Sequence, residues 1–176
     1  MAQINRDKTA CFTGHRPNKI GGYNENNPQR RAIKQRLRTE IINAILAGYD
    51  TFISGLALGI DTDAAEIVIE LRETDYPEIK LIGAVPFAGQ EKAWPSASQE
   101  RWRRIVERCD TVHYVSDCGF ASWKMQRRNE WMVDYASLVI AVWDGTSGGT
   151  GNCVEYARKV THQPRVLQIN PKEGTK

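Results

Sequence analysis

The sequence lacks the features of a membrane-bound or secreted protein. Its continuous apolar runs, such as 138–143, are far shorter than the ~20 residues that a helix needs to span a bilayer. The first residues are polar and charged, so we expect no signal peptide. The four cysteines form no Cys-x-x-Cys pair. Cys11 and Cys153 lie in or beside apolar elements, so we expect buried free thiols in a reducing compartment. We therefore expect a cytoplasmic protein that does not contact a membrane.

The common signatures of metal and nucleotide chemistry are also absent. The three histidines lie far apart, so no metal site is expected. There is no Gly-x4-Gly-Lys-Ser/Thr loop and no Gly-x-Gly-x-x-Gly fingerprint, which argues against a P-loop ATPase and against a classical dinucleotide fold. No Gly-x-Ser-x-Gly elbow is present either. We expect no cofactor, and a net charge of +3 is as compatible with a phosphate-bearing small ligand as with a polyanion.

The order of elements predicts an α/β fold. At 176 residues the chain is expected to form a single domain, 1–176, with its core at about 8–170. Asp61 is expected to cap one helix, and Ser96 with Gln99 to form a capping box on another. Strands are predicted at 9–13, 51–53, 80–85, 111–115, 138–143 and 165–169, and helices at 28–47, 61–72, 96–108, 122–135 and 150–160. This alternation predicts a three-layer Rossmann-like fold, with a mainly parallel sheet flanked by helices on both faces.

The first predicted helix has clear ends and two different faces. Asn27 is placed to cap it, Pro28 to be its first residue, and Gly48 to follow its end. Apolar residues recur along one face at helical spacing. The other face is basic, and we interpret it as a solvated surface rather than a binding patch; its members are Arg30, Arg31, Lys34, Arg36 and Arg38.

The stretch 137–155 carries the strongest functional pattern. A buried apolar strand, 138–143, leads into a turn at 144–152 that contains four glycines, and a helix follows. Glycines allow the backbone to approach a ligand closely, and the unpaired N–H groups of a helix start attract anions. Such a turn can also be a mere connection. The other glycine-rich or charged turns, however, also follow strands, at 14–16, 54–61, 86–90 and 116–119. All of them should therefore meet at the carboxyl edge of the sheet, where open α/β sheets bind ligands.

Three motifs together resemble a known superfamily. Gly-His-Arg-Pro at 14–17, Ser-Gly-Leu-Ala-Leu-Gly-Ile-Asp at 54–61, and Arg-Asn-x-Trp-Met-Val-Asp at 128–134 are similar to the YpsA-like branch of the SLOG superfamily. The likeness covers about 8–170. It implies a central strand order 3-2-1-4-5, a site for nucleotides or nucleotide-derived ligands such as ADP-ribose or NAD, and a homo-oligomer.

Two branches of that superfamily imply different activities. The 54–61 stretch resembles the segment with which Smf/DprA proteins bind single-stranded DNA, but Leu58 stands where those proteins carry arginine, so any nucleic-acid binding should be weak. The residues 125–128 and 148–155 resemble the catalytic motifs of Lonely-guy phosphoribohydrolases, which would make Arg128 and Glu155 catalytic in an N-glycosidase. Ser147, Asn152 and Asn129 depart from that pattern.

We therefore expect a nucleotide-binding sensor or regulatory module, with an N-ribosyl hydrolase and a single-stranded DNA binder as alternatives. Within these readings, His15 could equally be a packing residue. Glu155 could merely complement the helix dipole, and Arg128 could be a surface ion-pair partner. The candidate site residues are Gly14, His15, Arg16, Ser54, Gly55, Gly59, Asp61, Arg128, Asn129, Asp144, Gly148, Gly149, Thr150, Gly151, Asn152 and Glu155.

Overall fold

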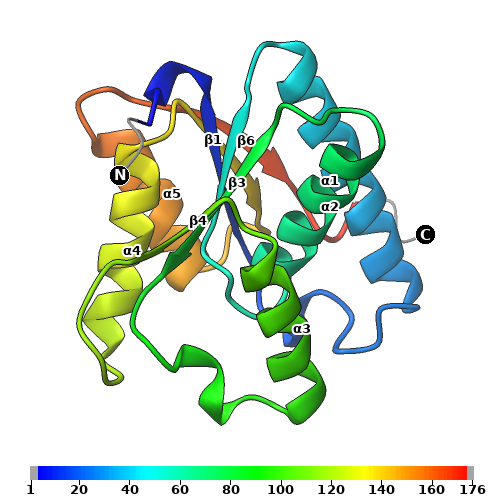
Figure 1. Cartoon of the computed structure of the whole chain (residues 1–176), viewed down its shortest axis with the longest axis vertical. Coiled ribbons are helices and arrows are strands. Elements are labelled where there is room, and N and C mark those ends of the chain that lie inside the picture. The colour runs from blue at the N-terminus through cyan, green and yellow to red at the C-terminus, as the bar shows by residue number, and fades with distance from the viewer. Residues whose placement is uncertain (1–3, 174–176) are drawn as a thin grey trace.

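A computed structural model, which describes residues 4–173, contains one six-stranded parallel sheet with helices on both faces (Figure 1). The predicted α/β class is confirmed. The strands are β1 Thr9–Gly14, β2 Thr51–Ser54, β3 Lys80–Val85, β4 Thr111–Tyr114, β5 Leu138–Val142 and β6 Arg165–Ile169. The helices are α1 Pro28–Leu46, α2 Ile60–Thr74, α3 Ser96–Glu107, α4 Ser122–Asp134 and α5 Gly149–Lys159. No helix among the described residues is long and apolar enough to cross a membrane.

The strand order is β4-β3-β2-β1-β5-β6, which differs from the order that the resemblance implied. The neighbour of β1 is β5, and β4 lies at the edge beyond β3. The helices α1, α2 and α3 cover one face of the sheet, whereas α4 and α5 cover the other (Figure 1). The chain therefore leaves β1 and β5 toward opposite faces, which makes the gap between their carboxyl ends the topological switch point.

The local sequence pattern predicted the cap of one helix correctly and that of another wrongly. The Asn27 side chain caps α1 as predicted, by accepting hydrogen bonds from the backbone N–H groups of Gln29 and Arg30. The predicted capping box of α3 is wrong, because Ser96 lies inside the helix and Gln99 instead donates to the carbonyl of Trp94.

The start of α2 also differs from the prediction. Gly59 occupies the N-cap with φ 99°, and Asp61 lies within the first turn. A Cβ on Gly59 would come 2.5 Å from the His15 carbonyl oxygen. The close approach of two loops, rather than a capping side chain, therefore fixes this end of the helix.

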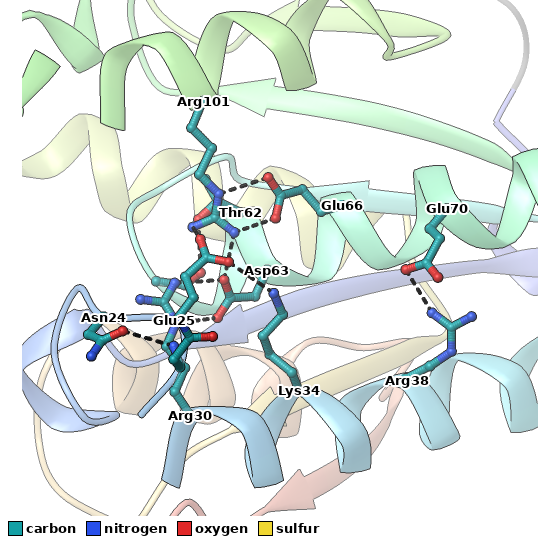
Figure 2. Close-up of polar contacts among 12 residues, drawn as sticks. Asn24, Glu25, Arg30, Lys34, Arg38, Thr62, Asp63, Glu66, Glu70 and Arg101 are labelled. Atoms are coloured by element: carbon teal, nitrogen blue, oxygen red, sulfur yellow. Dashed lines mark hydrogen bonds and ion pairs between the residues drawn. The ribbon is translucent and has the colours of Figure 1, made fainter. Parts of the chain in front are cut away.

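The sequence pattern suggested that the basic face of α1 is a solvated surface, but part of this face is buried. Arg30 is almost fully buried and pairs with Asp63 of α2, while Arg38 pairs with Glu70 (Figure 2). Arg101 from α3 joins Asp63 as well. This ion-pair network joins the three helices on one face of the sheet.

Candidate functional site

A cavity of about 310 Å³ opens at the switch point, between the loops that follow β1 and β5. Its walls also include residues from the start of α2 and from α4. The residues that line it are Thr13, Gly14, His15, Arg16, Asn18, Lys19, Ala57, Asp61, Met125, Arg128, Asn129, Thr146, Ser147, Gly148, Gly149, Thr150 and Gly151. These segments are far apart in sequence, and the parallel topology brings them to one edge of the sheet.

Arg128 is the most unusual residue of this cavity. Its side chain is only 6% exposed, and Nη1 donates to Asp61 Oδ2 at 3.2 Å. Nε is buried and has no hydrogen-bond partner among the described residues. A buried guanidinium N–H without a partner costs free energy. Because Arg128 lines the cavity, its positive charge is placed to attract an anion there.

Gly55 makes room for the Arg128–Asp61 pair. A Cβ at this position would lie 1.5 Å from Arg128 Nη1 and 2.6 Å from Asp61 Oδ2. Ser54 supports the same corner, because its hydroxyl donates to the Asp61 carbonyl oxygen at 2.7 Å. The motif at 54–61 therefore lines the cavity with Ala57 and Asp61, while Ser54 and Gly55 support it from behind.

The start of α5 forms the opposite wall. Gly148 is its N-cap with φ 139°, a conformation that favours glycine, and no side chain caps the helix. A Cβ on Gly148 or Gly149 would meet no atom within 4 Å. The backbone conformation therefore favours glycine at Gly148, whereas nothing in the packing requires it at Gly149. Asn129 donates to the carbonyl of Gly149 at 3.3 Å and so ties α4 to this turn. Residues 148–151 line the cavity, so the positive end of the α5 dipole lies at its wall.

A chain of polar contacts ties the two loops together across the cavity. His15 Nε2 lies 2.7 Å from Asp144 Oδ1, and the Thr146 hydroxyl donates to the same oxygen at 2.6 Å. Lys19 Nζ donates to the Thr146 hydroxyl oxygen at 2.8 Å. Hydrogen bonds from Thr146, with help from Lys172 and His15, hold the pKa of Asp144 well below its usual range. Asp144 therefore stays ionised at neutral pH and fixes the loop that leads into α5.

The cavity carries an excess of positive charge. Arg16, Lys19 and Arg128 line it, and Asp61 is its one carboxylate among the described residues. Burial raises the pKa of Asp61, whereas Arg128 and Arg16 oppose that rise. Asp61 is already engaged by Arg128. Arg16 and Lys19 therefore leave a net positive charge at the cavity that favours an anion.

The structure brings most of the candidate site residues together. Those that line the cavity are Gly14, His15, Arg16, Asp61, Arg128, Asn129, Gly148, Gly149, Thr150 and Gly151. Ser54, Gly55, Gly59 and Asp144 lie behind or beside its walls. The sequence prediction missed Thr13, Asn18, Lys19, Ala57, Met125, Thr146 and Ser147, most of which adjoin the predicted motifs.

Glu155 does not share the cavity with Arg128, contrary to the geometry that the resemblance implied. Its side chain is 65% exposed and lies 3.6 Å from Lys159, one helical turn away. Together with Asn152, Glu155 faces a separate shallow hollow on α5. The carboxylate is therefore remote from the donors that line the switch-point cavity.

Replacing Gly55 with alanine should disturb the cavity without adding or removing a charge. Because the new methyl group would overlap the guanidinium of Arg128, we expect the free energy of unfolding to fall by about 1–3 kcal/mol. Chemical denaturation followed by tryptophan fluorescence would measure this change. Gly22→Ala is a control for glycine replacement, because a Cβ there meets no atom within 4 Å, although its positive φ adds some strain. An equal loss in both variants would contradict the close-packing argument.

Comparison with known proteins places the whole core in one family. The model of the YspA SLOG family matches residues 10–171. A similar curated protein is the uncharacterized SPbeta prophage-derived protein YoqJ of Bacillus subtilis (strain 168). The two are 36% identical over 132 residues, which is 68% of this chain and 76% of YoqJ.

Two solved structures share the fold. DNA processing protein A from Streptococcus pneumoniae superposes with a TM-score of 0.62 and 17% identity, over 93% of this chain and 50% of that one. The Helicobacter pylori protein of the same name, solved to explain its single-stranded DNA binding mode, gives a TM-score of 0.61 and 19% identity. That match covers 92% of this chain and 65% of the other. The present chain thus spans only part of both proteins.

Proposed function

The chain belongs to the YspA SLOG family, and we propose that it binds a phosphate-bearing, nucleotide-derived ligand in the switch-point cavity, as a sensor or regulatory module. The observation that carries this proposal is the buried guanidinium of Arg128, whose Nε lacks a partner in a cavity walled by an uncapped helix start. A phosphate would accept hydrogen bonds from both groups.

The size of the cavity supports a small ligand. Its volume of about 310 Å³ lies at the lower end of the range of ~300–1,000 Å³ that is usual for ligand pockets. Asn18 and Asn129 add side chains that can both donate and accept hydrogen bonds at the walls. Such groups suit the sugar or base of a nucleotide once its phosphate is held.

Titration calorimetry with a fixed panel tests the proposal. The panel is AMP, ADP, ADP-ribose, NAD and inorganic phosphate, each titrated at a protein concentration high enough to detect weak binding. We expect at least one nucleotide to bind more tightly than phosphate alone. Absence of heat with every member of the panel would contradict the proposal.

An N-ribosyl hydrolase is the second candidate, because the sequence resembles Lonely-guy enzymes at Arg128 and Glu155. The exposed position of Glu155 and its pairing with Lys159 favour binding without catalysis. We expect Glu155→Gln to leave nucleotide affinity unchanged, and we expect no base release from nucleoside monophosphates by either protein. Chromatography of the reaction mixtures would measure base release. Release by the wild type that disappears in Glu155→Gln would instead establish the enzyme.

Single-stranded DNA is the third candidate ligand. DNA processing protein A from Helicobacter pylori binds single-stranded DNA, and the exposed Arg16 and Lys19 at the cavity could contact phosphates. Leu58, however, stands at the position where Smf/DprA proteins carry arginine in the stretch that 54–61 resembles. We therefore expect weak oligonucleotide binding that falls further as salt is added. Tight, salt-sensitive binding in a fluorescence-anisotropy titration would favour single-stranded DNA over a nucleotide as the ligand of this cavity.

A further inference from the structure

A second pocket lies beside the switch-point cavity and shares a wall with it. We call it the Tyr23 pocket; its volume is about 380 Å³, and its walls come from residues within 17–30, 58–59 and 95–104. Arg16 and Ala57 line the cavity, whereas the residues that follow them in the chain, Pro17 and Leu58, line the Tyr23 pocket. The two spaces therefore lie on opposite sides of the same two chain segments, and one extended ligand can occupy both.

Tyr23 is held at this pocket by an ordered loop, although its side chain is 59% exposed. The backbone N–H of Gly22 donates to the carbonyl of Pro17 at 2.7 Å, and Arg30 Nη1 donates to the carbonyl of Gly22 at 2.9 Å. The Tyr23 side chain itself makes no hydrogen bond and no ring contact within residues 4–173. An aromatic ring that is fixed in place and left uncovered is suited to stacking on a flat partner such as a base.

The apolar residues of the pocket point to the same kind of partner. Pro17, Leu58 and Pro95 line it together with Tyr23. Leu58 is half-buried, and it stands at the position where Smf/DprA proteins carry arginine. A leucine offers no hydrogen bond to a phosphate, whereas it can pack against the flat face of a base. The departure from the Smf/DprA pattern therefore suits a base at this place.

The arginines of the pocket differ in what they already contact. Arg30 and Arg101 both pair with Asp63 and so belong to the ion-pair network of the three helices (Figure 2). Arg104 is exposed and makes no hydrogen bond or ion pair with the rest of the described chain. Its charge makes the mouth of the Tyr23 pocket favourable for an anionic ligand.

Arg16 stands at the wall between the two spaces. Its side chain reaches solvent and has no hydrogen bond or ion pair among residues 4–173. Partial burial lowers the pKa of its guanidinium, Asp61 opposes that change, Arg128 adds to it and Tyr23 opposes it. The charge of Arg16 therefore interacts with residues of the cavity and with Tyr23 alike. An anionic group that crosses the shared wall would meet an unpaired guanidinium.

We propose that the Tyr23 pocket binds the base of the same ligand that occupies the switch-point cavity. The base stacks on Tyr23 and packs against Leu58, while Arg16 holds a phosphate at the shared wall. This subsite rests on the proposed function, because the cavity must hold the other end of the ligand. It also narrows the ligand class. The ligand carries a base at one end, a pyrophosphate in the middle and a second sugar at the other end, as ADP-ribose does.

Calorimetry with two ligands that differ in their base tests the subsite. ADP-ribose carries adenine, whereas ribose 5-phosphate offers only a phosphate and a sugar. We expect Tyr23→Ala to raise the dissociation constant of ADP-ribose at least about tenfold, because the stacking contact is lost. The same variant should bind ribose 5-phosphate as the wild type does. Tyr23→Phe keeps the ring, so its affinity for ADP-ribose should match that of the wild type.

Tyr135→Ala is the matched control, because Tyr135 is 40% exposed but lies at the end of α4 and lines neither space. Circular dichroism would confirm that each variant is folded. ADP-ribose that does not bind the wild type, or that binds wild type and Tyr23→Ala equally tightly, would overturn the subsite. Equal losses in Tyr23→Ala and Tyr135→Ala would overturn it as well.

These outcomes separate the subsite from the proposed function. Equal binding of ADP-ribose by wild type and Tyr23→Ala would leave nucleotide binding in the cavity standing, whereas absence of heat with every nucleotide of the panel would overturn both. A single-stranded oligonucleotide that loses more affinity in Tyr23→Ala than ADP-ribose does would assign the pocket to DNA and overturn the subsite.

Discussion

Replacement of Asp63 by alanine is expected to lower the free energy of unfolding by about 3–5 kcal/mol, the usual cost of removing one partner from a buried ion pair. The Asp63 side chain is fully buried and accepts hydrogen bonds from Arg30 at 3.2 and 2.7 Å and from Arg101 at 2.8 Å (Figure 2). Without its carboxylate, the guanidinium of Arg30 would remain buried at 2% exposure with only the carbonyl of Gly22 as partner. Urea denaturation followed by circular dichroism would measure the loss.

The matched control lies on the same two helices. Glu70 of α2 pairs with Arg38 of α1 at 2.9 Å, but its side chain is 59% exposed. Because an exposed pair contributes at most about 1 kcal/mol, Glu70→Ala should have a small effect. Equal losses in the two variants would show that burial of the Asp63 network is not what makes it important. Arg101 is expected to retain Glu66 in both variants, since those two side chains contact each other directly.

The Asp63 network also shows what the sequence could not reveal. The repeat of apolar residues predicted α1 correctly, because that face packs on the sheet. The repeat could not show that α2 and α3 would cover the adjoining basic face, since their carboxylates and arginines lie more than thirty positions away. A run of basic residues on one helix therefore suggests a solvated surface. Only the position of the partner helices shows that part of this surface is buried.

The strand order has a similar limit. Alternating strands and helices predicted a parallel sheet and the carboxyl edge as the site, and both follow from local pattern and chain handedness. Whether the fourth strand returns beside β1 or continues outward beyond β3 depends on long-range packing. The structure places β4 outside β3, and the switch point remains at β1 because β5 crosses to its other side.

Glu155 could have been placed better from the sequence alone. Val154, Ala157 and Val160 recur at helical spacing, and the first two are buried. Glu155, Arg158 and Lys159 fall between these apolar positions. That pattern already put Glu155 on the polar face, away from the sheet. Motif resemblance suggested a place beside Arg128, and the helical pattern opposed it. Arg128, in contrast, occupies a buried position of α4, an environment that a surface ion-pair partner would not have.

Arg128→Ala should weaken nucleotide binding more than any other single change at the cavity. A charge-assisted hydrogen bond to a buried partner contributes ~1.5–3 kcal/mol, so we expect the dissociation constant to rise by about 10- to 150-fold. The measurement is calorimetry with the member of the nucleotide panel that the wild type binds most tightly. Arg127→Ala is the control, because Arg127 is the adjacent residue of α4 and is exposed.

Loss of binding must be separated from loss of structure, since Arg128→Ala leaves the buried carboxylate of Asp61 without its ion-pair partner. The double variant Arg128→Ala with Asp61→Ala removes both buried charges, and it should recover part of the stability that the single variant loses. If Arg128 contacts the ligand through its unpartnered Nε, binding should stay weak in the double variant despite the better stability. Recovery of wild-type affinity in the double variant would mean that Arg128 only balances the charge of Asp61, and the anion would then be held by the start of α5 alone.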